Sequence, residues 1–390
     1  MPLTQSPLQT NWTNLPMSQD LAGLQEVLLV PWGQNEVKGA KRAAGLFDAQ
    51  GQFLPSGDCL RWANAPVTVE PEIDPSAPLT RLEGRYLYGG MLYGHFGHFL
   101  CESTARLWAL ARDQGFDGVV WLPKVRLGHA AKLVKPYHSF FAALGFERIG
   151  LFAPQTNTVI ESLIIPEQGF GIGDLSSGRP EYRDFMRKHL GANLAAEGAE
   201  KLYISRARLP GKRGSVLLEH LIEARLEAEG YTVFHPQDHS LAEQIAQYKA
   251  ARQIVALDGS ALHLAAMVMH PACKVAIINR GPSQNIDDYL RQFEAFTGTV
   301  PTRIDAVKSY WFYEGRRVVK RETHALLDFP ALGRALAAAG FRSATAWRAP
   351  TAAQIAAEVA LREARAEMRL TRYEVSDQAE EAEADLGAAR

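Results

Sequence analysis

Residue types that can support group-transfer chemistry occur in three short stretches of this sequence. The first is Gly97-His98-Phe99, followed at intervals of four residues by Glu102 and Arg106. This spacing places His98, Glu102 and Arg106 on one face of a helix. A histidine at a helix start is favoured in its neutral form by the helix dipole, so His98 is suited to act as a base that Glu102 could orient. The alternative interpretation is an ordinary surface ladder of polar side chains.

A second histidine, His95, lies three residues before His98, and the two together could suggest a pair of metal ligands. Protein zinc sites use three or four protein ligands. No third ligand lies nearby in the sequence, so we predict that this stretch holds no metal.

The second stretch is a cationic cluster that follows an apolar run. Ser205, Arg206 and Arg208 close a strand predicted over residues 201–205, and Arg213 lies just beyond them. Ligands of open α/β sheets bind beyond the carboxyl ends of the strands. Arginine side chains before a helix N-terminus suit a diphosphate, because the guanidinium groups and the first backbone amides of the helix all donate to phosphate oxygens. The alternative is a solvated basic loop.

The third stretch is Asp258-Gly259-Ser260, directly after the apolar run 253–257. Small residues at a strand-to-helix turn let a ligand approach the backbone amides, and Ser260 can donate to a phosphate. The alternative is a tight turn in which Gly259 and Ser260 have only a steric role. The second and third stretches both follow strands of the same half, so they could converge on one ligand.

The elements that position these residues alternate between strand and helix. Strand–helix units of this length require parallel strands with right-handed crossovers. The predicted strands are 27–31, 118–122, 148–152, 159–166, 201–205, 231–235, 253–257 and 274–279. The predicted helices are 98–110, 130–144, 215–229, 240–252, 325–339 and 351–370.

Other segments are expected to be irregular. Residues 1–25 resemble an arm, 48–78 is rich in turn-forming residues, and 376–390 is an acidic, frayed tail. The glycine-rich stretch 169–178 is not followed by an apolar helix, so a hinge or linker is favoured over a dinucleotide-binding loop. A hairpin is expected around Val318-Val319.

Composition narrows the class of protein. The chain has 390 residues, with 42 Lys+Arg, 43 Asp+Glu and a formal net charge of -1. A protein that coats nucleic acid needs a basic excess to displace counterions, so no nucleic-acid partner is expected. Cys59, Cys101 and Cys273 have no CxxC spacing, which indicates neither a disulfide framework nor a zinc knuckle. No membrane span and no secretory signal are expected. We therefore predict an intracellular protein.

Taken in order, several stretches resemble the family 61 glycosyltransferases, a group that includes many bacterial proteins of capsular polysaccharide synthesis. The similarity covers roughly residues 85–280. It is carried by residues 93–102 with Arg106-Leu107-Trp108, by 202–206 with Arg213, by Gly230-Tyr231, by 240–245 and by 255–262. The chain departs from the family at Leu218-Glu219, where Asn-Glu is usual, and at Asp258-Gly259-Ser260, where His-Gly-Ala is usual.

The resemblance implies an α/β fold of GT-B type, with two Rossmann-like domains facing across a cleft and Ala-rich C-terminal helices. Residues 1–175 would form an acceptor-side domain and residues 176–310 a nucleotide-sugar-binding domain. Residues 311–390 would form a hairpin and a helical extension. These C-terminal helices could contact a second subunit or the membrane surface.

The implied activity is transfer of a hexosyl, pentosyl or N-acetylhexosaminyl group from a nucleotide-sugar to a glycan hydroxyl. The expected donor is a UDP-sugar. We expect inversion, no metal and no cofactor, in bacterial surface polysaccharide synthesis in the cytoplasm, at the inner face of the membrane. Two alternatives stay open. One is a catalytically silent nucleotide-sugar or glycan-binding scaffold, and the other is a nucleotide-sugar epimerase.

The resemblance also distributes roles over the candidate residues. His98 is the expected base, Glu102 and Asp258 are the reserve candidates, and His95 and Arg106 would lie on the acceptor side. The donor would be held by Ser205, Arg206, Arg208, Arg213, Glu219, Gly259 and Ser260. An aspartate at position 258 would repel a diphosphate unless an arginine neutralises its charge.

Overall fold

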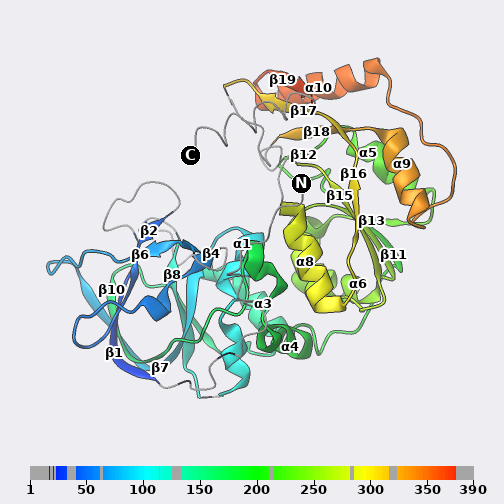
Figure 1. The fold of residues 1–390 in the computed structure, drawn as a ribbon. Helices are drawn as coiled ribbons and strands as arrows, with labels where there is room; N and C mark the ends of the chain where they lie inside the picture. Colours follow the sequence, from blue (N-terminus) through cyan, green and yellow to red (C-terminus); the bar gives the residue numbers. More distant parts are fainter. Residues whose placement is uncertain are drawn as a thin grey trace, which may run out of the picture. The chain divides into compact units, whose positions relative to one another are not determined.

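The chain divides into two compact units (Figure 1). The computed structural model describes residues 17, 21, 23–32, 41–61, 65–113, 115–124, 133–210, 214–281, 285–315 and 323–374. Unit 1 comprises Met1–Ala195, His263–Val268 and Arg291–Gly298, and unit 2 comprises Ala196–Leu262, Met269–Leu290 and Thr299–Arg390. The predicted hairpin at Val318-Val319, the acidic tail and most of the N-terminal arm lie outside the described residues.

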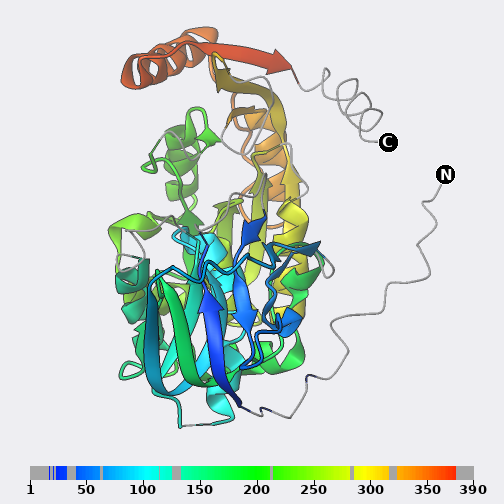
Figure 2. The same ribbon diagram turned by 90° about the vertical axis from the view of Figure 1, so that its left-hand side faces the viewer.

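A six-stranded mixed sheet forms the centre of unit 1, in the order β3-β1-β10-β7-β8-β9. Strands β10, β7, β8 and β9 run parallel, whereas β1 pairs antiparallel with both β10 and β3. Figure 2 shows these strands side by side. Their bounds are β1 Leu24–Val30, β3 Gly45–Phe47, β7 Leu79–Leu92, β8 Gly118–Pro123, β9 Gly150–Phe152 and β10 Asn157–Ile164.

The longest strand of this sheet, β7, carries glycines that conceal it in the sequence. Gly84 and Gly90 have positive φ angles, 106° and 89°, that other residues rarely adopt. A Cβ atom at Gly89 would overlap the indole of Trp121 on β8. The glycines therefore permit a bulge and a close approach between neighbouring strands, instead of ending the strand. No strand was predicted here.

The segment after β7 is not the single α-helix predicted over 98–110. A three-residue helix α1, Phe96–His98, leads into a π-helix over Phe99–Ser103, and a 3-10 helix spans Leu107–Ala111. The prediction is confirmed only in part, because residues 104–106 are not helical and separate the π-helix from the 3-10 helix. The four-residue spacing therefore does not keep Arg106 on the face of His98 and Glu102, and α1 is too short to supply much of a helix dipole.

The glycine-rich stretch is not a linker, because its apolar side chains are buried in unit 1. Phe170 is fully buried and stacks on Tyr182, with ring centroids 4.8 Å apart. The amide of Gly169 donates to the carbonyl of Ala105 at 2.8 Å. A 3-10 helix over Gly173–Ser177 then leads to α4, Pro180–His189, and α3 spans His138–Ala143.

Unit 2 contains a fully parallel five-stranded sheet in the order β13-β11-β14-β15-β16. Counted along the chain, this is the 2-1-3-4-5 order of doubly wound sheets, in which the order reverses between the first and third strands. The reversal lies between β11 and β14. The bounds are β11 Lys201–Ile204, β13 Thr232–Phe234, β14 Gln253–Leu257, β15 Lys274–Asn279 and β16 Thr302–Asp305.

The predicted alternation of strand and helix is confirmed for the second half, with one difference. Helix α6, Leu241–Ala250, lies within the predicted helix 240–252 and begins with a capping box formed by Ser240 and Glu243. The predicted helix 215–229 begins instead with a short strand, β12 Ser215–Val216, before α5, Glu219–Glu227. Helices α7 and α8 span Ala261–Val268 and Asn285–Thr297.

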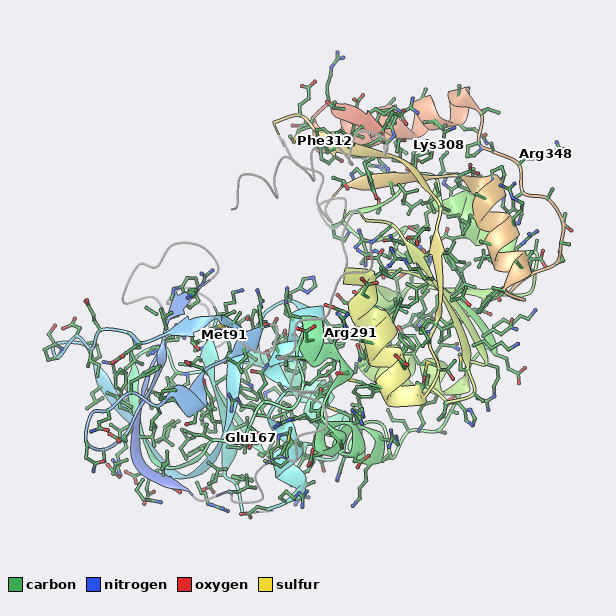
Figure 3. The ribbon with its side chains drawn as sticks, viewed as in Figure 1. Met91, Glu167, Arg291, Lys308, Phe312 and Arg348 are labelled. Atoms are coloured by element: carbon green, nitrogen blue, oxygen red, sulfur yellow. The ribbon has the colours of Figure 1, made fainter. Side chains whose placement is uncertain are left out.

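A four-stranded mixed sheet, β12-β18-β17-β19, completes unit 2. Lys308 and Phe312 on β17 and Arg348, between α9 and α10, mark this part in Figure 3. The helix predicted over 325–339 begins with a strand, because residues 324–327 are buried and pair with β17. The bounds are β17 Val307–Tyr313, β18 His324–Leu327, β19 Leu370–Glu374, α9 Phe329–Ala338 and α10 Ala352–Ala366.

One apolar core joins both sheets of unit 2 through α5 and α9. It includes Tyr203 and Val255 of the parallel sheet, Ile222 of α5 and Leu332 of α9. Helix α10 has no fully buried residue; Ile355 packs against this core from its edge, and Arg362 donates to the carbonyl of Val216 at 3.1 Å. No helix within the described residues is long and apolar enough to cross a membrane.

Candidate active site

The first predicted cluster lies in unit 1, where β7 ends. The π-helix is bound to this strand end by Ser103, whose Oγ accepts from the amide of Tyr93 at 3.0 Å and donates to the carbonyl of Met91 at 2.8 Å. The indole of Trp121, on the neighbouring strand β8, donates to the Ser103 carbonyl at 2.9 Å. π-helical turns inside helices are frequent at functional sites. Here the π-helix carries Glu102 toward the strand end.

Glu102 is the hub of this cluster. Its Oε2 lies 2.5 Å from Nδ1 of His98, and Arg61 donates to Oε1 from Nε at 2.7 Å and to Oε2 from Nη2 at 3.1 Å. The hydroxyl of Tyr93 donates to Oε1 at 3.1 Å. Burial raises the pKa of Glu102, but the bonds from His98 and Arg61 outweigh burial, so the net pKa is lowered. Glu102 is therefore an ionised carboxylate that orients His98.

His98 is the accessible member of the pair. Its side chain is 40% exposed, against 4% for Glu102. The imidazole stacks on the ring of Tyr93, with centroids 5.2 Å apart, and meets His95 edge-on at 5.5 Å. With Nδ1 bonded to a carboxylate, Nε2 remains as the ring nitrogen that can accept a proton. This arrangement suits a general base.

Arg106 does not join this cluster. It is buried, donates from Nη2 to the carbonyl of Asp58 at 2.7 Å and also donates from Nη1 to the carbonyl of Pro166. Its guanidinium lies 5.4 Å from the ring centroid of Tyr88. These contacts join three separate segments of unit 1, so Arg106 stabilises the fold of this unit.

The second and third predicted stretches do meet, at the carboxyl ends of β11, β14 and β15 in unit 2. Arg206 follows β11, Asp258 and Gly259 follow β14, and Arg280 follows β15. In doubly wound sheets the crevice at the reversal of strand order is the usual ligand site. The described side chains of this group thus lie where the topology of unit 2 predicts a ligand.

Arg206 is placed by contacts on two sides. Its backbone amide donates to Oε1 of Glu219 at 2.7 Å, and its Nη2 donates to the carbonyl of Gly214 at 3.4 Å. A Cβ atom at Gly259 would lie 2.5 Å from Nη1, so only glycine leaves room for this guanidinium. Burial and the nearby Arg280 lower the pKa of Arg206 to about 10. An anion at this position would be strongly favoured.

Asp258 is neutralised as the sequence requires. Its Oδ1 accepts from the amide of Arg280 at 3.1 Å and lies 3.4 Å from Arg280 Nε, and both side chains are at most 4% exposed. The Arg280 Nε also donates to the Asp258 carbonyl at 3.0 Å. Asp258 therefore fixes Arg280 at the strand end.

Glu219 is a fully buried carboxylate whose pKa is raised. Besides Arg206, its Oε1 accepts from the hydroxyl of Tyr203 at 3.1 Å and lies 3.2 Å from the hydroxyl of Ser205. Its Oε2 is buried without a hydrogen-bond partner among the described residues. Burial raises the pKa of Glu219 to about 7, despite the bond from the Arg206 amide. Leu218, in the left-handed conformation (φ 60°), directly precedes it at the start of α5.

The remaining predicted residues are dispersed. Arg208 is exposed and pairs with Asp238 at 2.9 Å. Ser260 directly precedes α7, and Arg213 lies outside the described residues. Among the described residues, no group of three or more His, Cys, Asp or Glu side chains is arranged to hold a metal ion.

Four residues of the two clusters were not predicted. Arg61 and Tyr93 complete the Glu102 network, and Lys124 lies with its Nζ 4.5 Å from the centroid of the Tyr93 ring. Arg280 completes the unit 2 cluster. Arg280 directly follows the predicted strand 274–279 and Lys124 lies two residues after the predicted strand 118–122, so a search of strand-end residues would have found them. Arg61 had no such signal, because its partner is 41 residues away.

Comparison with known proteins bears on both clusters. Residues 96–276 match the family model Glycosyltransferase 61. The matched range begins at α1 and ends within β15, so it contains His98, Glu102, Arg206 and Gly259, whereas Arg61 and Arg280 lie outside it.

The structural comparison gives a weak likeness to a solved glycosyltransferase. This is the dodecameric iron-containing heptosyltransferase TibC in complex with ADP-D-β-D-heptose, 10% identical to this chain. The superposition covers 78% of this chain and 80% of that one, with a TM-score of 0.30. No curated protein matches the chain in sequence.

Proposed function

We propose that the protein is a glycosyltransferase that moves a sugar from a nucleotide-sugar to a glycan hydroxyl. The observation that carries the proposal is the arginine cluster of Arg206 and Arg280 beside Gly259, at the reversal of strand order in unit 2. The match of residues 96–276 to the glycosyltransferase 61 model supports the same class of reaction. Two guanidinium groups at strand ends suit a diphosphate, because arginine forks bind phosphate oxygens bidentately.

In this proposal unit 2 holds the donor. Arg206 and Arg280 donate to the diphosphate and stabilise the charge that develops on it as the sugar leaves. The backbone after β14 approaches the ligand closely because Gly259 has no side chain. Two guanidinium groups can stabilise this charge without a metal ion, so we propose a metal-independent reaction. We propose a UDP-sugar as the donor because of the resemblance to the family 61 glycosyltransferases.

Unit 1 supplies the base. The acceptor hydroxyl gives its proton to Nε2 of His98, while Glu102 holds Nδ1 and stabilises the imidazolium that forms. The hydroxyl oxygen forms the new bond to the anomeric carbon, and the bond from that carbon to the diphosphate breaks with its electron pair on the phosphate oxygen. Attack opposite the leaving group inverts the anomeric centre.

The setting we propose is bacterial surface polysaccharide synthesis, in the cytoplasm at the inner face of the membrane. A GT-B arrangement of two nucleotide-binding-type domains would accompany it. These finer points rest on the family resemblance of the sequence motifs and not on the geometry of either unit.

Release of nucleotide from UDP-sugars tests the proposal. The purified protein is incubated with UDP-linked hexoses, pentoses and N-acetylhexosamines and a mixture of glycan acceptors, with and without EDTA, and UDP is quantified by chromatography. We expect acceptor-dependent release that EDTA does not affect. His98→Ala should reduce it by about 10²- to 10⁴-fold, the contribution of a positioned base.

Two results would contradict the proposal. Conversion of a UDP-sugar to its isomer without release of UDP would indicate an epimerase. Binding of nucleotide with neither release nor conversion, for every donor and acceptor, would indicate a silent scaffold. Lys188→Gln, a change at an exposed lysine on α4, is the control and should leave release unchanged.

A further inference from the structure

We propose that unit 1 binds an acceptor that carries an anionic group, a carboxylate or a phosphate, through Lys124 beside His98. This inference rests on the proposed function in calling the ligand an acceptor. It deepens that function by naming the chemical class of the acceptor, which neither the sequence motifs nor the family match supplies.

The position of Lys124 is fixed by the sheet. It directly follows β8, and its backbone amide donates to the carbonyl of Leu92 at 2.9 Å, where the neighbouring parallel strand β7 ends. Tyr93 follows β7 in turn, so its ring and Lys124 extend from adjacent strand ends. The carboxyl ends of parallel strands are the edge of a sheet at which ligands bind.

The aromatic ring of Tyr93 links Lys124 to the predicted base. The Nζ of Lys124 lies 4.5 Å from the ring centroid, and the imidazole of His98 stacks on the same ring with centroids 5.2 Å apart. A cation over an aromatic face is stabilised, but the ring supplies no formal negative charge. Lys124 and His98 therefore both contact the ring of Tyr93, so an anion held by Lys124 would lie in the same cluster as the predicted base.

The charges around Lys124 do not balance. Glu102 is the carboxylate of this cluster, and it is already bonded to Arg61 at 2.7 Å and 3.1 Å and to His98 at 2.5 Å. Among the described residues, no carboxylate lies within 4.0 Å of the Lys124 ammonium. The positive charges of Arg61 and Arg42 add to that of Lys124.

The electrostatic environment of the lysine agrees with this imbalance. Burial lowers the pKa of Lys124, and the positive charges of Arg61 and Arg42 lower it further, whereas Glu102 acts in the opposite direction. A half-buried ammonium in surplus positive potential is a site that an anionic group would complete. A lysine is a compact point charge, so a carboxylate and a phosphate are both accepted.

Ligand-detected NMR with small sugars tests the inference on the full-length protein. Dissociation constants are measured for methyl β-D-glucuronide, which carries a carboxylate, for glucose 6-phosphate, and for the neutral methyl β-D-glucoside, with inorganic phosphate as the free anion. We expect at least one charged sugar to bind about tenfold more tightly than the neutral one. The two charged probes distinguish a uronic acid from a sugar phosphate.

Three variants attribute the preference to the lysine. Lys124→Gln should abolish the preference for the charged sugar, Lys124→Arg should retain it, and the control Lys188→Gln should leave it unchanged. Equal binding of charged and neutral sugars by the wild type would overturn the inference, as would a preference that survives Lys124→Gln. A preference for inorganic phosphate alone, with no charged sugar bound, would show an adventitious ion only and would also overturn it.

The outcome is separable from that of the proposed function. If UDP binds and is released but the acceptor preference is absent, the anionic acceptor is wrong and the glycosyltransferase stands. If the charged sugar binds through Lys124 but no nucleotide binds to unit 2, the donor site is wrong while the anion site stands.

Discussion

Replacing Gly259 by alanine isolates the role of Arg206 from the stability of unit 2. The backbone of Gly259 is not in the left-handed region, so an alanine fits its conformation. The added Cβ would lie 2.5 Å from Nη1 of Arg206, 3.4 Å from Cζ and 3.5 Å from Cδ. The clashing group is the end of a flexible side chain, which moves more readily than backbone. We therefore expect the guanidinium to shift while the fold is retained.

The expected loss follows from the contact that moves. A hydrogen bond to a charged group contributes about 1.5–3 kcal/mol, and 1.4 kcal/mol corresponds to a factor of ten in affinity. Gly259→Ala should therefore weaken UDP binding by about 10- to 100-fold. The thermal unfolding midpoint should change by only a few degrees, because no buried apolar contact is removed.

A double-mutant cycle tests whether Gly259→Ala weakens UDP binding by displacing Arg206. UDP is titrated calorimetrically into the wild type, Gly259→Ala, Arg206→Ala and the double variant. If the alanine acts by displacing Arg206, the double variant binds no more weakly than Arg206→Ala alone, so the two effects are strongly non-additive. Unchanged UDP affinity in Gly259→Ala would refute the reasoning. An equal loss in the presence and absence of Arg206 would refute it as well.

Three further predictions concern Glu219, Glu102 and Arg106. Because burial raises the pKa of Glu219 from 4.5 to about 7, its contribution to stability is present below pH 4.5 and is lost as pH rises through 7. Glu219→Gln should flatten this dependence by about 3 kcal/mol in chemical unfolding at pH 5 and 8, and a profile identical to that of the wild type would contradict it. Glu102→Gln leaves Arg61 and His98 without their carboxylate, so we expect a loss of about 3 kcal/mol of stability together with lost UDP release. Normal stability and activity would remove Glu102 from its role. Arg106→Met should lower the unfolding midpoint by several degrees and leave UDP affinity within twofold, whereas lost affinity in a stable variant would place Arg106 in the site.

The parallel sheet of unit 2 could be predicted from the sequence because its local patterns agree with its packing. The apolar runs 253–257 and 274–279 are the observed strands β14 and β15, and the capping box at Ser240 begins α6. The strand ends in turn predicted Arg206 and Asp258. In this sheet, most strands that are consecutive in the chain are also neighbours, as β14, β15 and β16 are.

The structure of unit 1 was harder to predict from the sequence, because its key positions are determined by contacts with residues distant in the chain. The glycines of β7 indicate a loop when the sequence is considered locally, and only the indole of Trp121 explains Gly89. The change from α1 to a π-helix is likewise set by the bonds of Ser103 to the end of β7. Helical periodicity alone cannot distinguish 3.6 residues per turn from a locally wider winding.

The ion pairs of the two clusters also differ in how far the sequence predicted them. The neutralisation of Asp258 was anticipated as a requirement, but Arg280 was not identified as the residue that meets it. Arg61 reaches Glu102 across 41 residues of sequence, and no local pattern indicates such a pair.

Calorimetric titration of the wild type and Arg206→Ala with UDP, GDP, CMP and ADP, each with and without EDTA, tests the nucleotide site of unit 2 most directly. We predict that UDP binds selectively, that EDTA leaves its affinity unchanged and that Arg206→Ala weakens UDP binding by at least the 10- to 100-fold expected for Gly259→Ala. Absence of binding for every nucleotide, or UDP affinity in Arg206→Ala equal to that of the wild type, would contradict a donor site at the ends of β11, β14 and β15.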